Sequence, residues 1–205
     1  MTLSDKGLQL ILDWEVGGGK VYYNRFCKRP VVPDPENTQS GVTIGIGWDC
    51  GYATEESLEQ EWGDYLDASD IDRLKAVIGL RSMDAFQALP SLSDLEIEWE
   101  SALDQFLKYT VPKYWYETCR AFPGVEDAPQ CVQEPLLSLV FNRGASMEGD
   151  RRREMRDIRS SVASKDWFFI PNSLREMKRL WVKVPGLQNR REAEAKFIEN
   201  NCDQT

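Results

Sequence analysis

Helical periodicity runs through most of this 205-residue chain and is interrupted in one long stretch, residues 17–50. Ser4 is placed to cap a first helix, whose apolar residues recur on one face and whose last turn contains Glu15. Three consecutive glycines, residues 17–19, predict the end of that helix, because glycine readily adopts the backbone conformation of a helix terminus.

The interrupted stretch has the composition of a short β-hairpin. Residues 20–24 (KVYYN) predict a strand, residues 25–40 predict a loop rich in proline and polar side chains, and residues 41–48 (GVTIGIGW) predict a second strand. Glycine alternates with β-branched residues in the second strand, which indicates a close approach to a ligand or to another element.

Helical patterns resume at residue 54. Thr54 and Ser69 are predicted caps, Gly79 a stop, and Pro135 a first-turn residue. Further helices are expected near residues 82–89, 93–109, 111–120, 133–142, 150–163, 171–181 and 188–200.

The predicted fold class is therefore α+β and mostly α, within one domain that spans residues 1–205. We expect a small β-hairpin lobe at about 17–50, a larger helical lobe at about 54–200, and a ligand cleft between the two lobes.

The chain contains no histidine, which excludes Ser-His-Asp and Cys-His catalysis and the usual zinc hydrolase sites. Catalysis would rest on carboxylates, hydroxyls, lysine or arginine, and we expect neither a metal nor a cofactor. The net charge of −9 argues against nucleic acid and anionic membranes as partners. Acids dominate residues 55–104 and bases dominate residues 143–196, which predicts two solvated faces of opposite sign or, in the basic half, a site for an anionic polymer.

Five cysteines, none in a CxxC pair, leave the redox state open. Activity outside the cytosol would favour two disulfides, Cys27 with Cys50 and Cys119 with Cys131. The start of the chain lacks the apolar run of a signal peptide, and no stretch approaches the ~20 apolar residues of a membrane span. We expect a monomer that is made in the cytoplasm, is delivered by other means and does not insert into a membrane.

Glu15 is the first candidate for chemistry, because it follows two apolar residues of the first helix by one turn and precedes the glycines. Partial burial favours the protonated form of a carboxyl group, which is the form that a general acid needs. The alternative is a surface or capping glutamate.

The second candidate is the run from Ser40 to Asp49. Thr43 and Asp49 would share one face of a regular strand with the glycines, and such an open polar face suits a cleft wall. The alternative is a tight hairpin in which Asp49 is a cap. Asp34 and Asn24 flank this run, either as cleft residues or as ordinary turn residues.

Two further motifs lie in the helical half. Phe141-Asn142-Arg143-Gly144 ends an apolar helix, where the amide of Asn142 suits a sugar acetamido group and the alternative is a simple helix C-cap. Arg190-Arg191, with Trp181 upstream, predicts the solvated start of a basic helix or part of a site.

Together and in this order, these motifs resemble the phage-type lysozymes, the endolysin-like muramidases of the lysozyme superfamily. The resemblance covers nearly the whole chain and is carried by Glu15, by TIGIG at 43–47, by FNRG at 141–144 and by RREAE at 190–194. The form S-G-V-T-I-G-x-G-x-D is most similar to a branch found in endolysins and in lysozyme-like toxin domains of bacterial secretion systems.

The resemblance implies a lysozyme-like fold and a peptidoglycan hydrolase that cleaves the β-1,4 bond between N-acetylmuramic acid and N-acetylglucosamine. Glu15 would be the acid and Thr43 would assist a second carboxylate. The family places an Asp or Cys nine residues after the glutamate, where this chain has Asn24. Asp49 and Asp34 are the candidates for the second carboxylate, and Asp49 is preferred because it directly follows the motif strand.

The resemblance also suggests residues that bind the sugar chain. Asn142 and Arg143 would bind acetamido or lactyl groups, and Tyr22 and Trp48 would stack on sugar faces. The expected partners are peptidoglycan strands, a phage or secretion-system delivery protein and, for a toxin, an immunity protein. Three alternative functions stay open: a lytic transglycosylase, a chitinase, and a module that binds a glycan or a partner protein without cleaving it.

Overall fold

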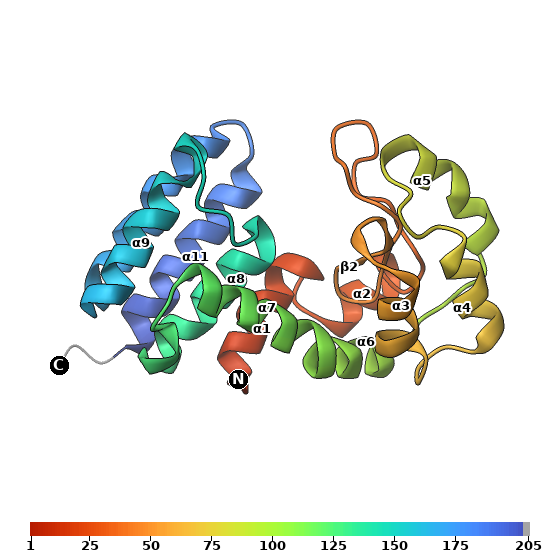
Figure 1. Cartoon of the computed structure of the whole chain (residues 1–205), viewed down its shortest axis with the longest axis horizontal. Helices are drawn as coiled ribbons and strands as arrows, with labels where there is room; N and C mark the ends of the chain where they lie inside the picture. The colour runs from red at the N-terminus through yellow and green to blue at the C-terminus, as the bar shows by residue number, and fades with distance from the viewer. Residues whose placement is uncertain (203–205) are drawn as a thin grey trace. The chain divides into compact units, whose positions relative to one another are not determined.

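Helices dominate both of the units into which this chain divides (Figure 1). The computed structural model describes residues 1–202. The hairpin unit comprises Glu15–Val111, and the helical unit comprises Met1–Trp14 together with the chain from Pro112 onward. The chain is thus α+β and mostly α, as predicted, and its one sheet within the described residues has two strands. The hairpin unit also contains the helices up to residue 110, so its far boundary lies well beyond the residue 50 that was expected for the β-lobe.

Helix α1 (Asp5–Glu15) begins and ends as predicted. The amide of Gly7 donates to Ser4 Oγ at 3.0 Å, which is the expected cap. The buried carboxylate of Glu134 completes it by accepting hydrogen bonds from Ser4 N at 2.6 Å and Ser4 Oγ at 3.0 Å. After Glu15, residues 17–19 have φ angles of 55°, 94° and 132°, which glycine tolerates and which end the helix.

The strand predicted over residues 20–24 is wrong, because this segment forms helix α2 (Lys20–Phe26). Tyrosine and valine favour strands only where a pleated surface buries them. Here Tyr23 is buried with its hydroxyl donating to the carbonyl of Ile97 at 3.0 Å, whereas Val21 is 86% exposed. Tertiary contacts of one tyrosine therefore decide the local structure.

The strand predicted over residues 41–48 is instead a tight hairpin. Strand β1 (Thr43–Ile44) pairs antiparallel with strand β2 (Trp48–Asp49), and Thr43 lies opposite Asp49. The turn between them needs φ angles of 57° at Gly45 and 76° at Gly47, which explains the glycines. Directly opposed residues point to the same face, so the shared face predicted for Thr43 and Asp49 is confirmed.

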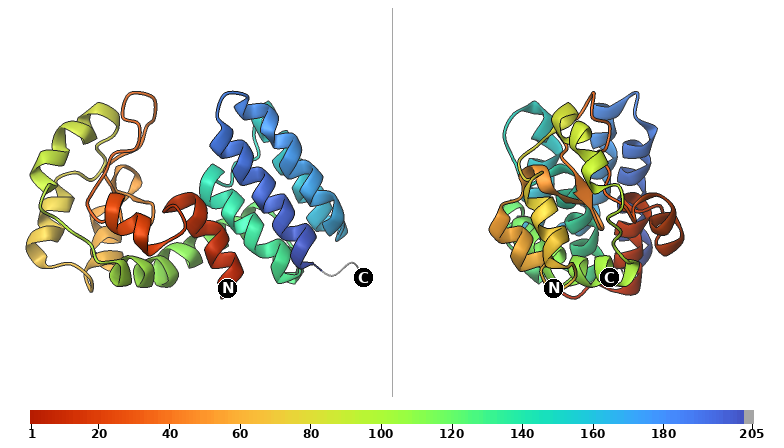
Figure 2. Two further views of the ribbon diagram at one scale, coloured as in Figure 1. Left: turned by 180° about the vertical axis from the view of Figure 1, so that it is seen from behind. Right: turned by 90° about the vertical axis from the view of Figure 1, so that its right-hand side faces the viewer.

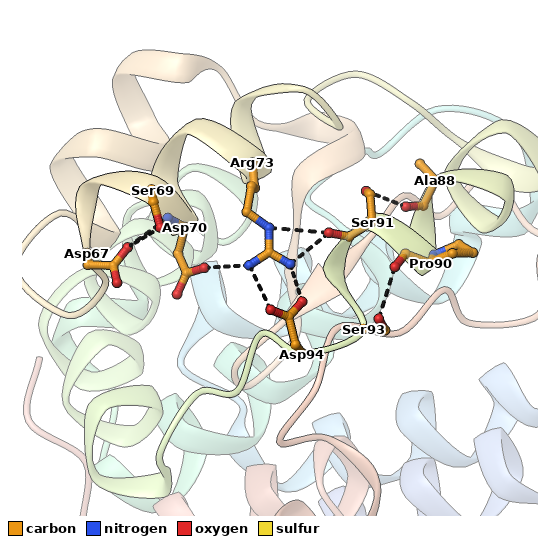
Figure 3. A network of polar contacts seen from close by, with 9 residues as sticks. All are labelled: Asp67, Ser69, Asp70, Arg73, Ala88, Pro90, Ser91, Ser93 and Asp94. Carbon is orange, nitrogen blue, oxygen red and sulfur yellow. Dashed lines mark hydrogen bonds and ion pairs between the residues drawn. The ribbon is translucent and has the colours of Figure 1, made fainter.

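The rest of the hairpin unit is a series of short helices. They are η1 (Cys50–Tyr52), α3 (Glu55–Trp62), α4 (Ala68–Lys75), α5 (Ser82–Ala88), η2 (Leu89–Leu92), α6 (Trp99–Gln105) and the π-helical turn η3 (Phe106–Thr110). Thr54 caps α3 as predicted, whereas the cap of α4 is Asp67 and not Ser69. Figure 3 shows Arg73 joining α4 to the end of η2, because its guanidinium contacts Asp70, Asp94 and the carbonyl of Ser91.

The helices of the helical unit pack around one core. They are α7 (Val111–Ala121), η4 (Val125–Asp127), α8 (Gln130–Arg143), η5 (Asp150–Arg152), α9 (Arg153–Ser164), η6 (Trp167–Phe169), α10 (Ile170–Glu176), η7 (Met177–Trp181) and α11 (Pro185–Asn201). Helix α11 packs against both α8 and α10, and α10 packs against α9 (Figures 1 and 2). Pro135 lies inside α8 rather than in its first turn, because that helix begins at Gln130, earlier than expected.

The disulfide joins Cys131 to Cys202, so the two pairs expected from the sequence are wrong. Cys27, Cys50 and Cys119 are free thiols. Cys131 lies in the first turn of α8, and Cys202 directly follows α11. The packing of these two helices brings the two residues together across a sequence separation of 71 residues.

The solvated helix predicted at Arg190-Arg191 is also wrong, because both side chains are buried. Glu194, which is fully buried, accepts hydrogen bonds at one carboxylate oxygen from Arg191 at 2.7 Å and from Ser138 at 2.8 Å. Arg190 donates to the carbonyl and the hydroxyl of Ser138, each at 3.1 Å. Buried charges of this kind need such partners, because an unpaired buried charge is costly.

Candidate functional site

A pocket of about 260 Å³ in the hairpin unit contains three of the four predicted catalytic residues. Glu15, Thr43 and Asp49 all line it. The remaining lining residues are Val16, Cys27, Val31, Pro33, Ser40, Gly45 and Gly47. The pocket therefore combines two carboxyl groups and two hydroxyl groups, the side chains that a glycosidase needs and that a chain without histidine can supply.

Glu15 reaches this pocket because helix α1 ends there. Its side chain is partly exposed, and the next residue, Val16, is buried. The glycines that follow turn the chain away at once, so the last helical side chain lies beside the pocket. The sequence signal for this residue was its place on the apolar side of a helix that stops abruptly.

Thr43 and Asp49 are held by the hairpin. Asp49 Oδ1 accepts two backbone hydrogen bonds, from Gly41 N at 2.9 Å and from Gly51 N at 2.8 Å. Burial raises the pKa of the Asp49 carboxyl above its ordinary value of 3.8, and the two amides and the nearby Arg81 oppose that rise. Among the described residues, both hydrogen bonds of this carboxylate go to Oδ1, which leaves Oδ2 for another contact.

Asp34 does not line the pocket. It is an exposed loop residue with a φ of 41°, and its side chain accepts a hydrogen bond from Asn37 Nδ2 at 2.8 Å. Its carbonyl also accepts the amides of Asn37 and Thr38. These contacts are those of a turn residue. Asn24 is exposed on α2 and does not line the pocket either.

The two predicted stacking residues differ in their surroundings. Tyr22 is 44% exposed on α2, and its ring lies against Gly17, where a Cβ would approach the ring to 2.4 Å. Trp48 is 6% exposed, and its indole donates to the buried carboxylate of Glu61 at 2.7 Å. A buried ring presents no face to a sugar, so the stacking role expected for Trp48 is wrong in this structure.

Asn142 and Arg143 belong to the helical unit and end helix α8. Gly144, with a φ of 72°, follows as the C-cap, as the sequence alternative predicted. Both side chains are partly buried. The residues that line the pocket in the hairpin unit do not include them.

Cys27 is a pocket residue that the sequence did not single out, and Ser40 entered only as the first residue of the run that ends at Asp49. Cys27 entered the sequence argument only as a possible disulfide partner in the predicted loop at 25–40, and nothing in that position indicated a pocket residue. Burial raises the pKa of its thiol, so the thiol is the dominant form at neutral pH. Ser40 directly precedes Gly41, whose amide donates to Asp49, and this place in the motif indicates that Ser40 lies near the same carboxylate.

A larger pocket, of about 700 Å³, lies in the helical unit beside the disulfide and carries no comparable chemistry. Its walls include Trp167, Phe168 and Ile198. Among the described residues that line it, Glu199 is the one carboxylate, and Arg175 binds both oxygens of that group at 2.6 and 2.7 Å. The smaller pocket is therefore the better candidate for catalysis.

Within residues 1–202, no group of three or more Cys, Asp or Glu side chains is arranged to hold a metal ion. None of the helices described is both long and apolar enough to cross a membrane. The sequence matches no known protein-family profile and no curated protein. The pocket is therefore interpreted from its own chemistry and from the motifs of the sequence.

Proposed function

We propose that this protein is a muramidase, a peptidoglycan hydrolase that cleaves the β-1,4 bond between N-acetylmuramic acid and N-acetylglucosamine. The observation that carries the proposal is that Glu15, Thr43 and Asp49 line one pocket. They come from a helix end and from two paired strands, in the order that motivated the resemblance to phage-type lysozymes.

In this proposal Glu15 protonates the glycosidic oxygen as the bond to the leaving sugar breaks. Asp49, through Oδ2, accepts a proton from the attacking water or stabilises the oxocarbenium-like transition state. Thr43, directly opposite Asp49 in the hairpin, orients that water through its hydroxyl. Asp49 is a better candidate than Asp34 for the second carboxylate, because Asp34 lies outside the pocket and is engaged in its own turn.

Three alternatives use the same pocket differently. A lytic transglycosylase needs the acid but no water and leaves an anhydro sugar. A chitinase accepts an uncharged polymer, and a binding module needs no acid. Product mass distinguishes the transglycosylase from the muramidase, activity on chitin identifies the chitinase, and the absence of turnover on both polymers identifies the binding module.

The test is incubation of purified peptidoglycan sacculi with the wild-type chain and its variants, followed by mass spectrometry of the soluble products. Glu15→Gln should stay folded and release at least about a hundredfold less product, the scale of general-acid catalysis. Glu36→Gln is the matched control, because this exposed glutamate of the same unit lies outside the pocket. Full activity in Glu15→Gln would overturn the assignment, and anhydro products would favour a transglycosylase.

A second pair of variants tests the second carboxylate. Asp49→Asn keeps an oxygen that can accept the two backbone hydrogen bonds, but it removes the charge. We expect it to lose activity while Asp34→Asn retains it, and the reverse result would reassign the role. As part of the same proposal, the protein acts on the cell wall as an endolysin or a secreted antibacterial effector, with a delivery protein and, for an effector, an immunity protein as partners.

A further inference from the structure

Two arginines at the end of α8 and the start of α9 are held together by the fold although both carry positive charge. Arg143 Nη2 donates to the carbonyl of Arg151 at 2.6 Å, and Arg152 Nη2 donates to the carbonyl of Arg143 at 2.6 Å. Each guanidinium thus binds the main chain of the other segment. This reciprocal pair of bonds fixes the two cations near each other at the turn that joins the two helices.

Neither arginine forms an ion pair with a described carboxylate. Among the described residues, neither Arg143 nor Arg152 has a carboxylate oxygen within the 4.0 Å of an ion pair. The nearby acid, Glu154, is fully buried and already binds Arg179 at 2.5 Å and Arg153 at 3.1 Å. The cations around this turn therefore outnumber the anions that could neutralise them.

Both guanidiniums also retain donor capacity. Arg143 Nε and Arg152 Nη1 are buried and have no hydrogen-bond partner among the described residues. Burial and the charge of Arg152 lower the pKa of Arg143 to about 10, and burial lowers the pKa of Arg152. An anion bound beside them would reverse this effect, because an opposite charge favours the ionised form.

An aromatic ring completes the surroundings of the pair. The guanidinium carbon of Arg143 lies 4.7 Å from the centre of the Trp181 ring, and that of Arg191 lies 5.8 Å from it. Arginine stacked on tryptophan keeps its edge available for a carboxylate, which it can bind with two parallel hydrogen bonds. Arg143 and Arg152 are both partly exposed, so part of each side chain is open to a ligand, although Arg143 Nε and Arg152 Nη1 themselves are buried.

We infer that Arg143 and Arg152, with Trp181 beside them, form a binding site for the carboxylate of an anionic sugar or of the peptide attached to it. This inference rests on the proposed function for the source of the carboxylate, which is a muramic acid residue or its peptide stem. The sequence predicted Arg143 as a residue that binds the sugar chain. The structure adds Arg152 beside it, and the two positive charges favour a carboxylate as the bound group. The site also explains how a chain with a net charge of −9 can hold an anionic substrate.

The test follows the indole N–H resonance of Trp181 in the full chain by two-dimensional NMR, with assignment from Trp181→Phe. The first probes are N-acetylmuramic acid and N-acetylglucosamine, which share the sugar ring and differ in the carboxylate-bearing lactyl group. Muramyl dipeptide is the third probe, because its lactyl carboxylate is converted to an amide and its one free carboxylate lies on the peptide. None of these probes has an internal glycosidic bond, so the result is independent of turnover.

We expect saturable shifts with at least one carboxylate-bearing probe at roughly tenfold lower concentration than with N-acetylglucosamine, as the loss of one charge-assisted contact implies. N-acetylmuramic acid alone would identify the lactyl carboxylate, and muramyl dipeptide would identify the peptide stem. Equal responses to the charged and neutral sugars would overturn the inference. That comparison uses the wild-type chain and needs no variant to fold.

A matched pair of double variants provides the second arm. Arg143→Gln with Arg152→Gln should weaken binding about tenfold or more. Lys113→Gln with Lys165→Gln changes the net charge equally at exposed positions of the same unit and should leave binding within about twofold, because exposed charges away from the site are screened. An equal loss in both pairs would overturn the site, whereas intact binding without wall hydrolysis would count against the muramidase alone.

Discussion

Removing the bond between Cys131 and Cys202 should lower the stability of the helical unit by about 4 kcal/mol. The disulfide spans a sequence separation of 71 residues, and the loop-closure relation gives about 4.4 kcal/mol at 25 °C for a loop of that length. Helices α8 and α11 pack together along their length, so we expect their packing to survive reduction and the loss to arise in the unfolded ensemble. At 2–4 °C per kcal/mol for a chain of this size, the melting temperature should fall by roughly 8–16 °C.

The assay is thermal unfolding of the oxidised chain, of the reduced chain, and of the double variant Cys131→Ser/Cys202→Ser. Thiol titration in denaturant should find the three free cysteines before reduction and all five after it. The double variant should melt like the reduced wild type and should not respond to reductant. An unchanged melting temperature in a chain with five titratable thiols would refute the reasoning.

Three other predictions concern single residues. Gly7→Ala should destabilise the fold, because a Cβ there would lie 2.2 Å from the carboxyl carbon of Glu134. Gly186→Ala should instead stabilise it by about 0.5–1 kcal/mol in urea unfolding, because a Cβ at that helical position meets nothing within 4 Å. Glu194→Gln should cost about 3–5 kcal/mol in the same assay, because it breaks a buried ion pair. If ionised Asp49 is required, hydrolysis should decline as the pH falls through a midpoint above 3.8, and a pH–rate profile with an ordinary aspartate midpoint would contradict this.

The sequence was most informative where a residue type has a local conformational reason to be present. Ser4 and Thr54 cap their helices as predicted, and the glycines after Glu15 end α1. The alternation in residues 41–48 correctly placed Thr43 and Asp49 on one face. The same alternation was misread as one strand, because two glycines separated by a single residue can also form a turn between two very short strands.

The errors arose where distant contacts decide the structure. A charge-rich helix start such as Arg190-Arg191 is usually solvated, but here it is buried and Arg190 donates hydrogen bonds to Ser138 of α8, a residue distant in sequence. The pairing of Cys131 with Cys202 depends on which helix ends meet, which cysteine spacing does not reveal. Trp48 was predicted to stack on a sugar because nothing nearby in sequence indicates that its indole is buried and donates to Glu61.

Asp49 has a structural role in the hairpin, and that role must be distinguished from any catalytic role. Its carboxylate joins the two ends of the hairpin through the amides of Gly41 and Gly51. A Cβ on Gly41 would lie 2.7 Å from Asp49 Oδ1, and one on Gly51 would lie 2.9 Å from Gly41 Cα, so both positions need glycine for packing alone. The glycines and Asp49 of this motif would therefore be needed even in a protein that only binds its ligand. Substitution of Glu15 leaves both of these Asp49 hydrogen bonds in place, and for that reason it is a more direct test of catalysis than substitution of Asp49.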